Sequence, residues 1–183
     1  MRKLIMMVVL AIVFGGGLSS AFAQERERQN AVFVDLGYPI AGLLLGGFGI
    51  GAGYERAFLP QISVRGNVGY IGYSNSDLDF MGFDIGAGLR YYPLSSAVGK
   101  FYIEGGFVYS PILIKHKGEE AASNIFVIAA SLGWKVIYKT GFFLEPYIGY
   151  KIGIGELNMP KGLSSVSYDP SGLAYGIGLG WAF

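Results

Sequence analysis

The stretch that decides the fold is the last one, residues 172–183, with the sequence GLAYGIGLGWAF. Large apolar side chains occupy every second position, and glycine or alanine occupies the positions between them. Successive side chains of a β-strand point to opposite faces, whereas a helix would mix the two sets around its axis. The stretch therefore predicts a strand with one bulky apolar face and one face of almost bare backbone.

The same alternation recurs upstream, in runs separated by connections rich in proline, asparagine, serine and glycine. No helical period of useful length is visible after the polar residues 24–30. The sequence predicts an all-β chain of eight antiparallel strands, each about ten residues long, that follow one another up and down. The connections are expected at 40–45, 59–60, 75–77, 93–99, 116–124, 139–141 and 156–171.

Composition excludes several function classes. Charged residues are 15% of the 183 residues and hydrophobic ones 52%, with a mean hydropathy of +0.43, which excludes a disordered, solvated chain. The formal net charge of +1 gives no electrostatic footprint for nucleic acid. The absence of cysteine excludes disulfides, thiolate catalysis and cysteine-ligated metal.

A targeting segment precedes the alternating part. Two basic residues come before an apolar run over 4–14, and Ala21-Phe22-Ala23 has the small-x-small pattern of a cleavage site. The run is shorter than the ~20 apolar residues that a membrane-spanning helix needs. We expect a cleaved signal peptide at 1–23, a polar leader at 24–30 and one barrel domain at 31–183.

Alternation alone does not say which face points into the barrel. A soluble barrel with an apolar interior and a membrane barrel with an apolar exterior both fit the pattern. Eight strands leave an interior that a few side chains fill, so the bulky apolar set is too large for it. We therefore expect the apolar face to meet lipid.

Aromatic residues are expected to mark the two membrane–water interfaces. One interface would have Phe58, Tyr91, Phe101, Tyr138 and Trp181, and the other would have Tyr38, Phe48, Tyr70, Tyr109 and Tyr150.

The inward positions also carry nearly balanced charge. They include Asp35, Glu55, Asp84, Glu104 and Glu145 against Arg65, Arg90, Lys135 and Lys151. Unpaired charges in so narrow a space are costly, so we expect a network of ion pairs that fills the barrel. An ion path or proton relay along the barrel is the alternative.

The final residues carry a motif of their own. Gly178, Trp181 and Phe183 have the spacing of the C-terminal signal of outer-membrane proteins. Together with the signal peptide and the eight strands, this motif makes the chain resemble small outer-membrane barrels of the OmpA, OmpX and OmpW type. The resemblance implies a bacterial outer-membrane location, contact with its lipids and assembly by the barrel assembly machinery. That family includes anchors, host-contact proteins and a narrow pore, so the fold does not give the activity.

Some outer-membrane barrels are enzymes, and their hydrolases generally use a histidine with a serine or acidic partner. The single histidine, His116, lies beside Lys115 and Lys117 in an expected polar loop, and no nucleophile motif accompanies it. A lone histidine without cysteine also argues against a structural zinc site. We expect no catalytic residue, metal or cofactor, and we expect His116 to be solvated.

One connection is apolar where a water-facing loop should be polar. Ile40, Leu43, Leu44 and Leu45 would rest in the outer leaflet if the first two strands run longer, or would form a hydrophobic mouth for apolar solutes. We expect a monomeric barrel with a filled interior and a structural or surface-interaction role. Its loops at 116–124 and 156–171 would meet a surface ligand or host molecule. A narrow OmpW-like pore for small hydrophobic compounds is the alternative.

Overall fold

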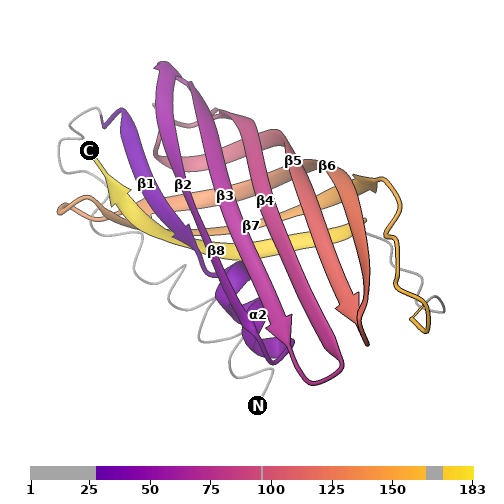
Figure 1. Ribbon diagram of the computed structural model, residues 1–183. Coiled ribbons are helices and arrows are strands. Elements are labelled where there is room, and N and C mark those ends of the chain that lie inside the picture. The colour runs from indigo at the N-terminus through magenta and orange to yellow at the C-terminus, as the bar shows by residue number, and fades with distance from the viewer. Residues whose placement is uncertain (1–27, 96, 164–170) are drawn as a thin grey trace.

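The computed structural model describes residues 28–95, 97–163 and 171–183, so the expected signal peptide at 1–23 lies outside the described residues. Eight strands and one helix follow one another along this part of the chain (Figure 1). They are β1 (Asn30–Asp35), α2 (Gly37–Leu44), β2 (Phe48–Leu59), β3 (Ile62–Ser74), β4 (Leu78–Tyr91), β5 (Lys100–His116), β6 (Glu119–Ile137), β7 (Phe142–Ile154) and β8 (Gly172–Ala182).

The sheet closes on itself. Each strand pairs antiparallel with the next strand of the chain, and β1 also pairs with β8. Val32 of β1 lies opposite Tyr54 of β2 on one side and Trp181 of β8 on the other. Closure removes the edge strands that an open sheet would expose. The predicted fold class, an eight-stranded antiparallel up-and-down barrel, is confirmed.

The connections lie at two ends of the barrel that differ in character. The turn end carries the connections at 60–61, 92–99 and 138–141, together with the start of β1 and the end of β8. The loop end carries 36–47, which includes α2, and the connections at 75–77, 117–118 and 155–171.

The loop expected at 116–124 is wrong, because this segment is the tip of a long hairpin. Strand β5 runs to His116 and β6 begins at Glu119, which leaves Lys117 and Gly118 as the turn. Both turn residues have positive φ, 49° and 86°, as the tight two-residue hairpin turn requires. β6 has 19 residues and pairs with β7 only from Phe126 onward, so its first part rises beyond the wall.

The expectation that no helix follows residue 30 is also wrong. Strand β1 ends at Asp35, whose carboxylate accepts a hydrogen bond of 2.8 Å from the backbone N–H of Gly37, and α2 begins there. Pro39 is tolerated because it falls in the first helical turn, where a backbone donor has no partner to lose. The helix has eight residues, too few for its period to stand out in the sequence. It lies at the loop end against β2 (Figure 1).

In the described part of the chain, no helix has the length and apolar character needed to cross a membrane.

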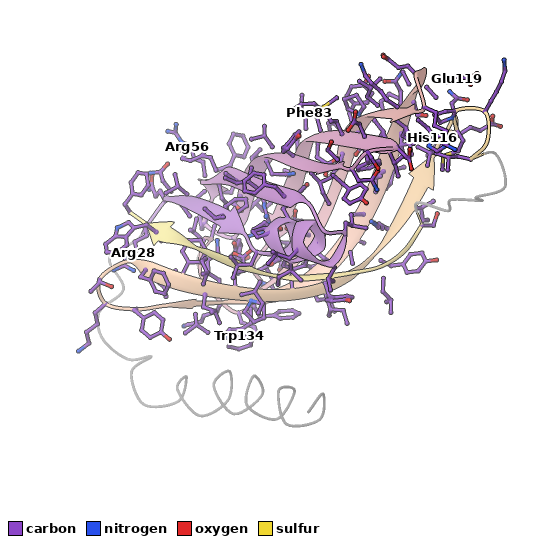
Figure 2. All side chains as sticks on the ribbon, turned by 60° about the horizontal axis from the view of Figure 1, so that its bottom comes forward. Arg28, Arg56, Phe83, His116, Glu119 and Trp134 are labelled. Atoms are coloured by element: carbon purple, nitrogen blue, oxygen red, sulfur yellow. The ribbon has the colours of Figure 1, made fainter. Side chains whose placement is uncertain are left out.

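The bulky apolar residues stand on the outer wall, as the sequence predicts. Ile85, Phe107 and Ile148 are 57–59% exposed. Figure 2 shows Phe83 and Trp134 pointing away from the ribbon. Of the residues expected to mark the interfaces, Phe48, Phe58, Tyr91, Tyr138, Tyr150 and Trp181 are exposed, and Tyr70, Phe101 and Tyr109 are half-buried. Tyr38 departs from the expectation, because it belongs to α2 and its ring points inward.

The small residues of the inner face make room for aromatic rings from α2 and from neighbouring strands. A Cβ added to Gly51 or Gly69 would lie 2.2–2.3 Å from the ring of Tyr38. The same close fit recurs around the barrel, with Phe33 over Gly53, Tyr102 over Gly133, Phe143 over Gly180 and Tyr147 over Gly176. The inner face therefore has glycine, with no side chain, at the positions where an aromatic ring from another element occupies the space.

The fit of α2 against the wall gives a test. A Cβ on Gly49 would lie 2.2 Å from the main-chain oxygen of Tyr38, so Gly49→Ala requires the helix to move. We expect it to lower the free energy of unfolding by about 1–3 kcal/mol, as overpacking does. The matched control is Gly105→Ala, whose added methyl meets nothing within 4 Å and should change stability by under about 0.5 kcal/mol. Urea unfolding of both variants makes the measurement, and equal loss in both would contradict the packing.

Candidate functional site in the barrel interior

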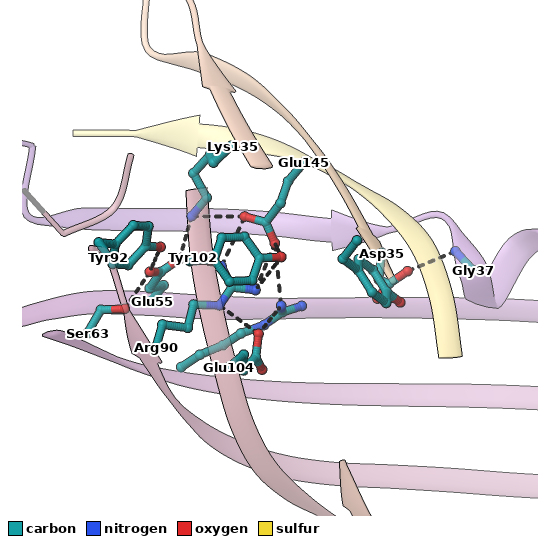
Figure 3. Close-up of polar contacts among 12 residues, drawn as sticks. Asp35, Gly37, Glu55, Ser63, Arg90, Tyr92, Tyr102, Glu104, Lys135 and Glu145 are labelled. Atoms are coloured by element: carbon teal, nitrogen blue, oxygen red, sulfur yellow. Dashed lines mark hydrogen bonds and ion pairs between the residues drawn. The ribbon is translucent and has the colours of Figure 1, made fainter. Parts of the chain in front are cut away.

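A single arginine lies at the centre of the interior charges. Arg90 of β4 is 1% exposed, and its guanidinium donates to three carboxylates. The donor–acceptor distances are 2.7 Å from Nε to Glu104 Oε2, 2.9 Å from Nη1 to Glu55 Oε2 and 2.8 Å from Nη2 to Glu145 Oε1. Because these carboxylates come from β5, β2 and β7, one side chain joins four strands across the barrel (Figure 3).

Two further cations complete the arrangement. Lys135 Nζ of β6 lies 3.0 Å from Glu145 Oε2 and also pairs with Glu55. Arg65 Nη1 of β3 lies 3.3 Å from Glu104 and 3.5 Å from Glu145. We call the six residues Glu55, Arg65, Arg90, Glu104, Lys135 and Glu145 the ion cluster. Three positive and three negative charges make it neutral as a whole.

Neutral hydroxyl groups satisfy the remaining carboxylate oxygens. Ser63 Oγ donates to Glu55 Oε1 at 2.5 Å, Tyr92 also donates to Glu55, and Tyr102 donates to Glu145 Oε1 at 3.1 Å. Burial raises the pKa of the Tyr92 hydroxyl well above its ordinary value, and the Glu55 carboxylate adds to the shift. The hydroxyl therefore stays protonated and remains a donor at neutral pH.

Each cation of the cluster also rests on an aromatic ring. The distances to the ring centroids are 3.9 Å for Arg65 over Phe33, 4.0 Å for Arg90 over Tyr102 and 4.6 Å for Lys135 over Phe143. Such contacts are worth about 2 kcal/mol or more when they are desolvated. They offset part of the cost of removing three cations from water.

Hydrogen bonding within the cluster is nearly complete. A buried ion without partners costs several kcal/mol, so a fully paired cluster is the form in which burial is tolerated. Within the described residues, Arg65 Nε is the one buried polar side-chain atom of the cluster that has no hydrogen-bond partner.

The other three charges predicted for the lumen lie outside the ion cluster. Asp84 accepts hydrogen bonds from Tyr38 Oη at 2.5 Å and from Ser110. Asp35 accepts one from Tyr147 Oη at 2.9 Å in addition to the Gly37 N–H. Phenols thus bind these two carboxylates where cations were expected. Lys151 is half-buried further along β7 than the cluster, in register with alanine and glycine.

The turn end of the interior is packed with apolar groups. The β4–β5 connection folds back so that Tyr92, Ala97 and Val98 are 0–7% exposed. It is held by backbone hydrogen bonds from Tyr92 N to Gln61 O and from Ala97 N to Pro60 O, at 2.9 and 2.6 Å. These three residues form one buried cluster with Ala31, Phe33, Tyr102, Phe143 and Ala182.

The residues proposed as a hydrophobic mouth lie on α2 and just after it. Ile40, Leu43, Leu44 and Leu45 are 53–82% exposed, whereas Gly42 packs against the backbone of β2. Neither a long strand pair nor an open loop is present at this position. The leucines project from the loop end on a short helix whose other face lies on the inner wall.

Two of the C-terminal motif residues, Trp181 and Phe183, lie at the turn end, and Gly178 lies further in, opposite Asp35 and Glu145. Gly178 of β8 is buried, Trp181 is 46% exposed on the outer wall, and Phe183 is 56% exposed. Phe183 exchanges two backbone hydrogen bonds with Asn30, at 2.8 and 2.9 Å, and so extends the β1–β8 pairing.

His116 is not the solvated loop residue that we expected. It is the last residue of β5 and half-buried, and its Nδ1 is buried with no hydrogen-bond partner among the described residues. Part of its ring lies 3.7 Å from the position of a Cβ on Gly162, in the connection after β7. In the described part of the chain, no group of three His, Cys, Asp or Glu residues could hold a metal ion.

The interior sites that sequence reasoning missed are the neutral ones. Tyr92, Phe143 and Ser63 contact or bind the buried charges but were not predicted to do so, and Tyr38 was predicted at a membrane interface instead. Strand parity is the signal that could have found most of them, because it places Ser63, Tyr102, Phe143 and Tyr147 on the inner face with Arg65, Glu104 and Glu145.

The geometry thus defines a closed barrel with an apolar outer wall and paired charges in its interior. No protein-family model matches the chain, and no curated protein matches it. Among solved structures, the chain is similar to the crystal structure of Ail, the attachment invasion locus protein of Yersinia pestis. The identity is 13% and the TM-score 0.49, over 86% of this chain and 99% of Ail.

The central position of Arg90 gives a second test. Arg90→Ala leaves three carboxylates, two of them buried and Glu104 half-buried, facing two cations, and breaking a buried pair typically costs about 3–5 kcal/mol. We expect a loss of that size, lowered if water enters the space. Lys117→Glu, in the exposed hairpin turn, is the control and should change stability by under about 0.5 kcal/mol. Urea unfolding in lipid vesicles compares the two, and equal stabilities would mean that the charges face a wide aqueous lumen.

Proposed function

We propose that the protein is an integral β-barrel of the bacterial outer membrane, with a filled interior and a structural or surface-interaction role. The observation that carries this proposal is the distribution of residues across the wall. Charges gather inside, where they pair, and the outer wall is covered by exposed Val, Ile, Leu, Phe, Tyr and Trp side chains. Exposed apolar surface on this scale is typical of proteins that contact lipid.

Strand length supports the same proposal. A tilted strand needs about 9–11 residues to cross the hydrocarbon core of a membrane. Strands β2 to β8 have 11 to 19 residues. β1 has only 6, and the chain continues from it into α2. In the proposed orientation the turn end lies toward the periplasm and the loop end toward the outside.

A surface role fits the loop end. The β5–β6 hairpin rises beyond the wall, and the connection after β7 lies along it. Lys161 N donates to Glu119 Oε2 at 3.0 Å, and Asn158 Nδ2 donates to the carbonyl of Ala122 at 2.9 Å. These contacts join two connections into one structured projection, which is the kind of surface that a ligand or host molecule can bind. The role needs no catalytic group and no cofactor.

The alternative, a narrow pore for hydrophobic compounds, has less support. Tyr38 fills the space over Gly51 and Gly69, and the ion cluster spans the barrel between it and the turn end. The leucines of α2 project outward and do not line an opening.

Single-channel recording tests the filled interior. We expect the protein in planar lipid bilayers to show no steady conductance, because an ion would have to displace the ion cluster and the ring of Tyr38. Steady wild-type conductance would instead favour the pore.

Deletion of Phe183 tests the location and the assembly signal. The motif Gly178, Trp181 and Phe183 leads us to expect that the deletion impairs assembly and leaves unfolded protein in the periplasm. The measurement is the amount of heat-modifiable barrel in outer-membrane fractions. Wild-type amounts after the deletion would refute the role of the motif.

A further inference from the structure

Charge is unevenly divided between the two ends of the barrel. The turn end carries Arg28, Arg56 and Lys139, which we call the basic rim, and also the half-buried Lys100 at the start of β5. Outside the ion cluster, the described residues of that end include no carboxylate side chain. The loop end carries mixed charge, with Asp77, Asp79, Glu119, Glu120 and Glu156 beside Lys115, Lys117 and Lys161. Figure 2 shows Arg28 and Arg56 at one end and Glu119 at the other.

The cations of the basic rim are available to a ligand. Arg56 is exposed on the outer face of β2, between Tyr54 and Phe58, which are 41% and 74% exposed. Lys139 is exposed in the β6–β7 turn. Arg28 donates to the carbonyls of Tyr138 and Lys139 at 3.1 and 2.8 Å, which fixes its positive charge beside Lys139 without neutralising it.

The basic rim follows one continuous sector of the wall. The strands in it are β6, β7, β8, β1 and β2, which are neighbours in the barrel. Exposed aromatic residues accompany the cations along this sector, namely Tyr54, Phe58, Trp134, Tyr138, Phe142 and Trp181. Aromatic rings and basic side chains together are characteristic of the level at which lipid headgroups meet hydrocarbon.

We propose that the basic rim binds the phosphate groups of anionic glycerophospholipids in the leaflet that the turn end reaches. The inference rests on the proposed membrane location and adds to it a lipid class and a binding surface. Guanidinium and ammonium groups donate well to phosphate oxygens, and arginine can do so with two parallel hydrogen bonds. Lipid is favoured over a soluble anion because the cations stand among apolar side chains that only hydrocarbon would cover.

The positions of the tryptophans make the proposal measurable. The protein has two tryptophans, Trp134 and Trp181, and both lie in the sector of the basic rim, exposed on the outer wall. Lipids with brominated acyl chains quench the fluorescence of a tryptophan only when they are in contact with it. Vesicles of phosphatidylcholine mixed with phosphatidylglycerol, with one or the other brominated, therefore report which lipid lies against this rim.

We expect phosphatidylglycerol to be favoured at the rim by about fivefold, the ratio for one basic residue near an anionic surface. The double variant Arg56→Glu/Lys139→Glu should bring the preference to one or below, and high salt should weaken the wild-type preference. The control is Lys117→Glu, which reverses one charge at the loop end where the double variant reverses two at the rim, and it should keep the preference.

Three outcomes decide the matter. Equal quenching by both brominated lipids in the wild type overturns the basic rim but leaves the membrane barrel in place. Loss of the preference in Lys117→Glu as well overturns the rim, since the effect would then follow net charge. Quenching by neither lipid overturns the proposed membrane location itself.

Discussion

The narrowness of an eight-stranded barrel is the constraint on which the rest of the structure depends. Charges that face such an interior are removed from bulk water, and they are tolerated only when each is paired. The ion cluster meets this condition with one residue from each of six consecutive strands, β2 to β7. Arg90 is central because its planar guanidinium can donate in three directions at once, which a lysine ammonium cannot do with the same fixed geometry.

The cluster also fixes how the strands align. A register slip of one residue exchanges the two faces of a strand, so it would move a charge from the cluster to the apolar wall. Glycine-rich strands with a simple alternation specify their register weakly, and β8 is the extreme case. In β8 the register is instead held by fit, because Phe143 and Tyr147 of β7 occupy the space over Gly180 and Gly176. The ion cluster thus fixes the register of β2 to β7, and ring packing fixes the register of β8.

The sequence alone predicts the parts of the structure that depend on strand parity. The strand count, the outward apolar face and the inward position of the cluster residues all follow from a period of two. Parity does not predict which of the inward side chains contact one another across the barrel. Asp35 and Asp84 were expected to pair with cations, yet each is bound by a phenol from another element.

The errors in prediction have a common cause, which is that local conformation overrides composition in short segments. α2 was missed because eight residues are too few for a helical period, although Asp35 followed by Gly37 and Pro39 is a reasonable start signal for a helix. The polar composition of the hairpin tip predicts a loop, whereas Lys117-Gly118 is a turn whose backbone angles suit two long strands.

The order of groups along the barrel axis bears on where function resides. From the turn end inward there is an apolar layer around Tyr92 and Val98, then the ion cluster, then the phenol-bound Asp35 and Asp84, and finally α2. Apart from Arg65 Nε, the polar groups named in these layers are paired with one another, so a solute that bound them would have to replace those contacts with its own. The surfaces that lack internal partners are the outer wall and the two rims. Binding by this protein is therefore best sought at the wall, at the hairpin projection of the loop end and at the basic rim.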